Sequence, residues 1–271
     1  MPELKDIAIV TGAASGMGEA AARILLDDGW TVLQCDLRKV AVNHDPKNSR
    51  GRTEVLTADI SDPDFGRTLL AALSGRRIGA LIHCAGLSPT MATQERILEV
   101  NLAATMRLVN TVRPHMAQGG CAVLFSSSGA HILGSSLDEQ INQIRTPESV
   151  SSLLTLTTDS GSAYTISKRA VKLLVEREAP AFGANGARIV SLSPGVIDTP
   201  MGRKEMEQHP IMHKMVELTP LPRAAKPEEI AAVAAFLCSP TAGFITGTDI
   251  LVDGGKIAVL VGAARQDNLV S

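Results

Sequence analysis

The chain has 271 residues, of which 45% are hydrophobic and 20% are charged, and its formal net charge is −2 at pH 7. This balance gives no electrostatic attraction towards nucleic acid or a membrane surface, and the apolar runs are far shorter than the roughly 20 residues of a membrane-spanning helix. Since no signal peptide is visible either, we expect one cytoplasmic domain over residues 1–271, with neither nucleic acid nor a membrane as a partner.

The first predicted element is a short strand, the apolar run Ile-Ala-Ile-Val at residues 7–10. It leads into a glycine-rich turn, residues 11–18, and then into an amphipathic helix. The backbone N–H groups of such a turn form a phosphate site together with the positive end of the helix, and glycine lets the backbone approach a ligand closely. We therefore expect a nucleotide to contact Gly12, Ser15, Gly16, Met17 and Gly18.

The second predicted strand, residues 31–35, ends at Asp36. In a dinucleotide-binding fold, an acid at this place accepts hydrogen bonds from the adenosine ribose. The same carboxylate would repel a 2′-phosphate, so Asp36 favours NAD over NADP. Arg38 and Lys39 favour the opposite choice, because a base here can accommodate that phosphate, but we interpret them as solvated loop residues.

A polar connection at residues 41–52 leads to a third strand at residues 54–56, which Asp59 and Ile60 follow. Asp59 either faces the adenine or starts the next helix. The second alternative fits because the local sequence, Asp-Ile-Ser-Asp-Pro, is typical of a helix start. Strands and helices then alternate to the end of the chain. This order favours a single-domain, Rossmann-type doubly wound parallel sheet with helices on both faces and ligands at the carboxyl ends of the strands.

Tyr164 and Lys168 form the most informative pair of side chains. Residues four apart on a helix share a face, so the phenol and the ammonium can point at one substrate atom. A free phenol ionises near pH 10, and a neighbouring cation lowers that pKa by stabilising the phenolate. The spacing therefore predicts a proton-transfer pair.

Together these motifs resemble the short-chain dehydrogenase/reductase family, over about residues 5–255. Residues 83–86, His-Cys-Ala-Gly, stand where the family usually has Asn-Asn-Ala-Gly. The missing asparagines weaken the expectation that side chains 83 and 84 stabilise the sheet. The resemblance still implies that the backbone of Cys84, Ala85 and Gly86 approaches the cofactor.

The resemblance implies a catalytic set made of Asn101, Ser126, Tyr164 and Lys168. Asn101 would bend a helix and hold a water that relays protons, although a simple cap or kink fits the same geometry. Aligning residues 126–129, Ser-Ser-Ser-Gly, with the family's Ser-x-x-Gly selects Ser126. The alternative is Ser127, because a shift of one residue reverses the direction of a side chain on a strand.

The turn at residues 193–199 matches the family's proline–glycine turn, and implies that the nicotinamide is held near Pro194, Gly195, Ile197 and Thr199. The implied reaction is hydride transfer with NAD. Tyr164 would take the alcohol proton in oxidation and donate it in reduction, Ser126 would orient the substrate oxygen, and Lys168 would lower the pKa of the phenol and bind the ribose. We expect no metal site, because the cysteines lack metal-ligand spacing.

Ser126 and Tyr164 are 38 positions apart, much farther than in most members of the family. The intervening insertion, residues 130–161, has a helical pattern, and Pro147 favours the start of a short helix. This resembles the bacterial 3-alpha-hydroxysteroid dehydrogenase/carbonyl reductase subset. The insertion either covers a face that other members use to form tetramers or is a surface elaboration.

Substrate choice is expected to reside in residues 196–225, whose four methionines either cover a hydrophobic substrate or pack on the core. The apolar tail at residues 257–261 is expected to pack on the body or on a partner subunit. We expect a homodimer or homotetramer that interconverts an apolar secondary alcohol and its ketone with NAD, a hydroxysteroid being one candidate. The alternatives are a 3-oxoacyl thioester reductase and a non-catalytic nucleotide-sensing scaffold.

Overall fold

The computed structural model describes residues 6–41, 50–133, 135–209 and 211–261. Its centre is a seven-stranded sheet of order β3-β2-β1-β4-β5-β6-β7, in which every pair of neighbours is parallel. The predicted doubly wound sheet is thus confirmed. The strands are β1 (Ile7–Thr11), β2 (Thr31–Asp36), β3 (Arg52–Thr57), β4 (Ile78–His83), β5 (Met116–Phe125), β6 (Arg188–Pro194) and β7 (Asp249–Val252).

The strand order reverses at β1, which pairs with β2 on one side and with β4 on the other. Thr11 is in register with Cys35 of β2 and His83 of β4, so all three strands end at the same level. A crevice opens at this kind of switch point, because the connections leave the sheet towards opposite faces. The fold therefore places the glycine-rich turn, the end of β2 and the end of β4 around one site.

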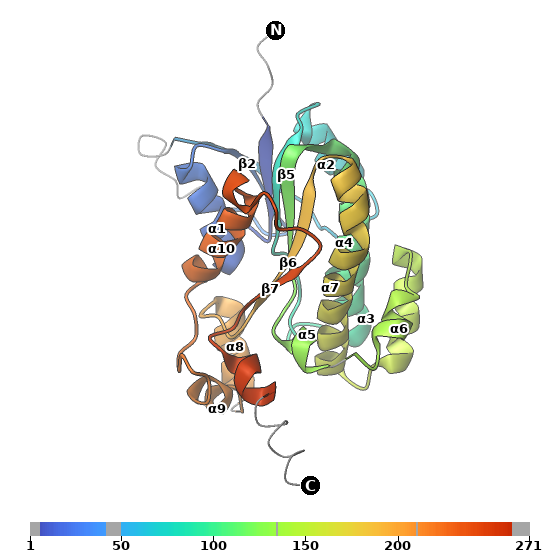
Figure 1. Cartoon of the computed structure of the whole chain (residues 1–271), viewed down its shortest axis with the longest axis vertical. Helices are drawn as coiled ribbons and strands as arrows, with labels where there is room; N and C mark the ends of the chain where they lie inside the picture. The colour runs from blue at the N-terminus through green and yellow to red at the C-terminus, as the bar shows by residue number, and fades with distance from the viewer. Residues whose placement is uncertain (1–5, 42–49, 134, 210, 262–271) are drawn as a thin grey trace.

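Helices cover both faces of the sheet (Figure 1). On one face α1 (Gly16–Asp27) packs against α10 (Pro227–Cys238). The other face carries α2 (Phe65–Leu73), α4 (Ala104–Val112) and the long α7 (Ser160–Ala184). The shorter elements include α3 (Gln94–Leu98), the π-helical turn η1 (Glu99–Ala103) and the 3-10 turns η2 (Arg113–His115) and η4 (Pro240–Ala242).

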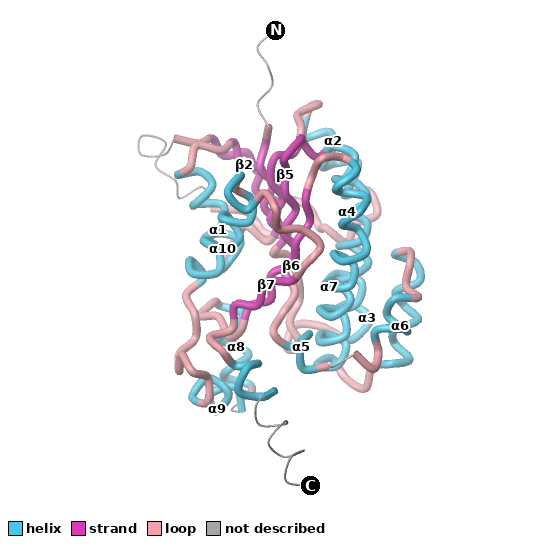
Figure 2. The backbone as a smooth tube through the Cα atoms, viewed as in Figure 1, coloured by secondary structure: helices cyan, strands magenta, loops and turns pink. Residues whose placement is uncertain are grey.

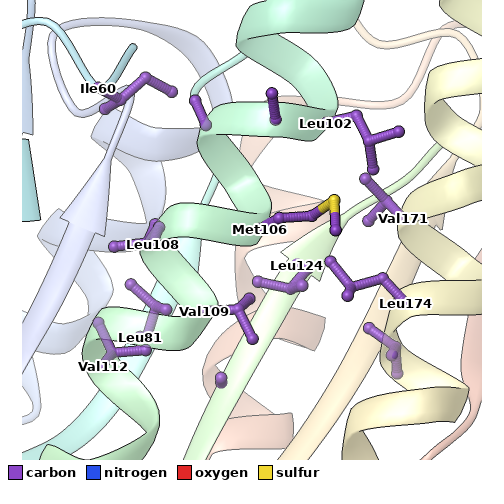
Figure 3. Packing of buried hydrophobic residues seen from close by; sticks show 14 of the residues in the cluster. Ile60, Leu81, Leu102, Met106, Leu108, Val109, Val112, Leu124, Val171 and Leu174 are labelled. Carbon is purple, nitrogen blue, oxygen red and sulfur yellow. The ribbon is translucent and has the colours of Figure 1, made fainter. Parts of the chain in front are cut away.

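The larger hydrophobic core lies between the sheet, α4 and α7 (Figure 3). Met106 and Val109 of α4 face Leu124 of β5 and Val171 of α7 there. Each fully buried side chain of this size contributes about 1.5–3 kcal/mol to stability. This packing fixes α7, and therefore the Tyr164–Lys168 pair, against the end of β5.

The insertion before α7 is helical, as predicted (Figure 2). It comprises α5 (Gly129–Ile132), α6 (Asp138–Asn142) and the 3-10 helix η3 (Pro147–Leu156), which begins at the predicted proline. Ile141, Val150 and Leu153 are buried in the larger core. Coverage of a tetramer face by this insertion stays a prediction.

The predicted substrate segment forms two helices, α8 (Pro200–Gln208) and α9 (Ile211–Glu217), at the end of the sheet where the strands finish (Figure 1). The tail continues as a helix at residues 256–261, where Ile257 is buried but residues 259–261 are 42–43% exposed. Most of the polar connection at residues 41–52 lies outside the described residues. Among the helices of the described ranges, none is long and apolar enough to cross a membrane.

Candidate active site

A cleft of about 490 Å³ opens at the carboxyl ends of β1, β2, β4 and β5, beside α8. This volume lies within the about 300–1,000 Å³ of ligand pockets. The cleft wall includes fifteen of the predicted site residues: Gly12, Ser15, Gly16, Met17, Gly18, Asp36, Asp59, Ile60, Cys84, Ala85, Gly86, Ser126, Tyr164, Lys168 and Thr199. The sheet thus brings together side chains that are far apart in the sequence.

The glycine-rich turn is packed so closely that there is no room for a side chain at Gly12 or Gly18. Gly12 has a φ of +69°, and a Cβ there would lie 2.8 Å from the backbone nitrogen of Ala85. A Cβ on Gly18 would lie 2.2 Å from the carbonyl oxygen of Gly12. The turn therefore holds its shape only with glycine, and its exposed side forms a cradle at the N-terminus of α1 where backbone N–H groups can bind phosphate.

Asp36 is fixed at the end of β2 by two backbone donors. Its Oδ2 accepts a hydrogen bond from Ala14 N–H at 2.9 Å, and its Oδ1 accepts one from Arg38 N–H at 2.8 Å. The Arg38 guanidinium donates to Ser15 Oγ at 2.7 Å and lines the cleft. The Arg38 side chain is 66% exposed in the loop after β2, which agrees with our interpretation of it as a solvated loop residue, and it also lies at the edge of the cleft beside the acid.

Asp59 lines the cleft but does not cap the next helix, whose N-cap is Asp64. Burial acts to raise the pKa of its carboxyl, and hydrogen bonds from Ser61 and Arg96 outweigh burial, so the pKa lies below the usual range. Asp59 Oδ1 also accepts from the Ser61 N–H at 2.8 Å and so holds the turn before α2. Contact of Asp59 with the adenine stays a prediction.

His83 is the centre of a buried chain of hydrogen bonds that the sequence did not predict. Thr105 donates its only hydroxyl hydrogen to the carbonyl of Asn101 at 2.9 Å. It must then accept from His83 Nε2–H at 2.9 Å, which leaves Nδ1 to accept from Thr11 at 2.7 Å. Burial, followed by the charge of Lys168, lowers the pKa of His83 to about 3. The neutral imidazole thus ties β1, β4 and α4 together. His83 therefore stabilises the sheet even though the family's asparagine is missing at this position.

Asn101 lies in the π-helical turn η1, which agrees with the predicted bend. Its side chain accepts from Leu87 N–H at 2.7 Å and donates to Leu87 carbonyl at 2.9 Å and to Ser167 Oγ at 3.3 Å. These bonds hold the loop after β4, and Asn101 is not among the described residues that line the cleft. The water relay at Asn101 stays a prediction.

Lys168 lies beneath Tyr164, with its Nζ 5.8 Å from the centre of the phenol ring. The ammonium donates to the carbonyl of Phe125 at 2.8 Å, and burial lowers its pKa to about 8. Burial raises the pKa of the Tyr164 phenol to about 12, with a hydrogen bond from Ser127 acting to lower it and the charge of Glu205 acting to raise it. Burial is the largest influence on the phenol in this structure, and Lys168 is bound to the Phe125 carbonyl. A lowering of the phenol's pKa by Lys168 stays a prediction.

The three serines after β5 have different partners. Ser126 is buried and donates its hydroxyl to the backbone carbonyl of Lys168 at 2.8 Å. Ser127 Oγ accepts from Gly129 N–H at 3.2 Å, and the Ser127 side chain also acts to lower the pKa of the Tyr164 phenol. Ser126 lines the cleft, whereas Ser127 is not among the described lining residues. Which of the two hydroxyls meets the substrate oxygen stays a prediction.

The proline–glycine turn is close to the cleft but contributes little of its wall. Thr199 lines the cleft, whereas Pro194, Gly195 and Ile197 are not among the described lining residues. Gly195 N–H donates to the carbonyl of Val252 at 2.9 Å, which anchors the turn to β7. Contact of these three residues with the nicotinamide stays a prediction.

Several lining residues were missed by the sequence analysis, among them Ser88, Thr90, Met91 and Lys204. The loop after β4 has no motif that distinguishes a cleft residue from a surface one. On α8 the signal was available, because Lys204 is three positions after Met201 and shares its face. Among the described residues, no group of three or more His, Cys, Asp or Glu could hold a metal ion.

Comparisons with known proteins agree with this geometry. Residues 6–136 match the short chain dehydrogenase family, and residues 144–256 match the family described as enoyl-(acyl carrier protein) reductase. The short-chain dehydrogenase/reductase bsc3 of Alternaria brassicicola is 33% identical over 264 residues, which cover 93% of this chain and 96% of that protein.

Two further relatives correspond to the predicted subset. The 3-alpha-hydroxysteroid dehydrogenase/carbonyl reductase of Comamonas testosteroni is 27% identical and covers 94% of this chain and 98% of its own length. The 3-alpha-hydroxysteroid dehydrogenase of Pseudomonas sp. B-0831, solved with NADH, superposes with a TM-score of 0.78 at 26% identity over 94% of this chain and 98% of that one. The chain therefore belongs to the short-chain dehydrogenase/reductase family and is an oxidoreductase, as its motifs predict.

Proposed function

We propose that this protein interconverts a largely apolar secondary alcohol and its ketone, a hydroxysteroid being one candidate, with NAD(H) as the cofactor. The observation that carries the proposal is the position of Tyr164. Its ring lies above Lys168, and it lines the same cleft as Ser126 and the glycine-rich turn. One cleft can therefore hold a nucleotide and a carbonyl compound side by side.

The residues around the cleft fit NAD. The cradle at Gly12 and Gly18 suits the pyrophosphate, and Asp36 suits the ribose hydroxyls of the adenosine. A Cβ on Gly86 would lie 3.1 Å from Asn101 Oδ1 and 3.5 Å from Lys168 Nζ, so the glycine leaves room between the loop after β4 and these two side chains. When bound, NAD(H) supplies the hydride acceptor or donor.

The chain's own residues handle the proton. With its pKa raised to about 12, Tyr164 is a neutral phenol at neutral pH, ready to protonate the substrate oxygen during ketone reduction. The hydroxyl of Ser126, which lines the cleft, or that of its neighbour Ser127 donates a hydrogen bond to the same oxygen and fixes its position. Lys168 is held by the Phe125 carbonyl at 2.8 Å, where it can bind the nicotinamide ribose.

The apolar side chains of the cleft wall support an apolar substrate. Leu87, Met91, Val100 and Met201 are among the lining residues. The names of the Comamonas and Pseudomonas relatives add a hydroxysteroid to the candidates. A cytoplasmic homodimer or homotetramer remains part of this proposal and is consistent with the net charge of −2.

The test is NADH oxidation, followed by absorbance, against cyclohexanone, a diketone, a 3-oxo-steroid and a 3-oxoacyl thioester. The proposal predicts turnover with NADH and a preference for a cyclic ketone. A preference for the thioester would support the alternative reductase. Tight NADH binding without turnover of any ketone would favour the nucleotide-sensing scaffold.

A further inference from the structure

Helix α8 turns one of its faces towards the cleft. Met201 and Lys204 are three positions apart, so they share a face of the helix, and both line the cleft. The residue between them in the chain, Arg203, leaves the helix in another direction. It donates to the carboxylate of Asp198 at 2.6 Å and lines a separate hollow beside α1. Of the two neighbouring cations, Lys204 is therefore the one that belongs to the cleft.

The other charged side chains of the cleft wall already have partners. The two acids and the two arginines form the ion pairs Arg38–Asp36 at 3.6 Å and Arg96–Asp59 at 2.9 Å. The buried Lys168 ammonium donates to a backbone carbonyl at 2.8 Å. In the part of the chain that the structure describes, no side chain forms an ion pair or a hydrogen bond with the ammonium of Lys204. Lys204 is thus the cation of the described cleft wall that has no partner.

The position of Lys204 along α8 separates it from the phosphate cradle. The helix begins beside the glycine-rich turn, since a Cβ on Gly16 would lie 3.0 Å from Cγ2 of Thr199, the N-cap residue. A helix rises about 1.5 Å per residue, so Lys204 lies about 7.5 Å farther along the axis than Thr199. The Lys204 side chain is exposed, which places it at the rim of the cleft. A negative group that remains at the rim while an apolar body enters the cleft can pair with it.

We propose that Lys204 determines specificity by pairing with a carboxylate that the substrate carries away from its reacting carbon. The substrate class is then an oxo acid and the matching hydroxy acid, with an apolar body between the two polar ends. A carboxylate fits better than a phosphate, because one unpaired cation balances one negative charge and a phosphate monoester carries up to about two. The inference rests on the proposed oxidoreductase function and adds an acidic group to its largely apolar substrate.

The test compares ring ketones that carry a carboxylate with the corresponding carboxamides, which have nearly the same shape and no charge. The acids are 3- and 4-oxocyclohexanecarboxylate and a 3-oxo-steroid whose side chain ends in a carboxylate. An exposed ion pair contributes up to about 1 kcal/mol, so the wild type should prefer one acid to its amide by about fivefold in kcat/KM. Lys204→Met should lower this ratio about fivefold, and Lys204→Glu should lower it further. High salt should lower the ratio in the wild type, because it screens exposed charges.

The control is Lys214→Met in α9, which removes the same charge from an exposed residue that is not among the lining residues. This variant should leave the ratio unchanged. The Kd for NADH, measured by fluorescence, should be unchanged in Lys204→Met, which excludes a folding defect and a contact between Lys204 and the cofactor phosphates.

Two results would overturn the inference. One is an equal ratio in the wild type and in both Lys204 variants, and the other is a Kd for NADH that rises about tenfold in Lys204→Met. Wild-type protein that reduces neutral ketones but none of the acids would overturn it as well, and would leave the proposed function intact. Wild-type protein that turns over no ketone at all would instead overturn the proposed function, and the inference with it.

Discussion

A pair of matched substitutions, Ser126→Ala and Ser127→Ala, can show which of the two serine hydroxyls acts in catalysis. Ser127 acts to lower the pKa of the Tyr164 phenol, whereas Ser126 lines the cleft and donates to the Lys168 backbone carbonyl at 2.8 Å. For this prediction we assign the catalytic role to Ser127, so Ser127→Ala should remove a donor to the oxygen that becomes an alkoxide during hydride transfer. Ser126→Ala should remove only a bond within the protein.

The two substitutions are expected to change different quantities, kcat in one case and the free energy of unfolding in the other. Loss of one preorganised donor to a developing oxyanion costs about 2.7–4 kcal/mol, or about 10²–10³ in kcat. Loss of one intramolecular hydrogen bond costs about 0.5–1.5 kcal/mol of folding free energy. Ser127→Ala should thus lower kcat by at least 100-fold with unchanged stability, and Ser126→Ala should lower stability by about 1 kcal/mol with little change in kcat.

The assay is steady-state ketone reduction with saturating NADH, paired with urea unfolding of each variant. NADH binding should remain normal in both, because neither hydroxyl lies at the glycine-rich turn. A Ser126→Ala protein of normal stability that has lost turnover, next to an active Ser127→Ala protein, would refute this assignment and restore Ser126 as the catalytic serine.

Three further outcomes follow from other parts of the structure. Asp36→Ala should raise the ratio of kcat/KM with NADPH to that with NADH by about tenfold, since one repulsive charge is removed and Arg38 remains; an unchanged ratio would show that Asp36 does not select the cofactor. His83 has a folded pKa of about 3 and an unfolded pKa of about 6.5, so the unfolded state binds the proton first and stability falls as pH drops below about 6.5. By pH 4 the wild type should lose about 3 kcal/mol more than His83→Asn, measured by urea unfolding, and parallel losses would contradict a neutral buried imidazole. The buried Asp249 carboxylate accepts from two serine hydroxyls of β6 at 2.6 and 2.9 Å and lies 2.8 Å from His131, so Asp249→Ala should lower the unfolding free energy by about 3 kcal/mol; a Tm within one degree of the wild type would show that this cluster contributes nothing.

The sequence identified the fold because its signals are local. The apolar run of β1, the glycines at 12, 16 and 18 and the acid after β2 each depend on neighbours within a few residues. Parallel pairing then brings the strand ends to one edge, so the positions of Asp36 and Gly86 follow from the topology. The insertion was also predictable, because its apolar residues recur at helical spacing and Pro147 starts a turn.

Some features of the site could not be predicted from the sequence. They depend on the direction of a single side chain or on contacts between residues that are far apart in the sequence. Ser126 and Ser127 differ by one position, so their side chains point in different directions, and the sequence alone does not decide which of them lines the cleft. The pKa of the Tyr164 phenol depends on burial, which the Tyr-x-x-x-Lys spacing does not encode. The chain through His83 joins three elements that are far apart in the sequence. No local pattern could have indicated it.

The central claim is that Tyr164 transfers the proton during NADH-dependent reduction. The most direct measurement is turnover of the best ketone by Tyr164→Phe, which removes only the hydroxyl, together with the Kd for NADH. The account predicts a loss of about 10²–10⁴ in kcat with an unchanged Kd. Turnover equal to that of the wild type would contradict the account, because another group would then supply the proton.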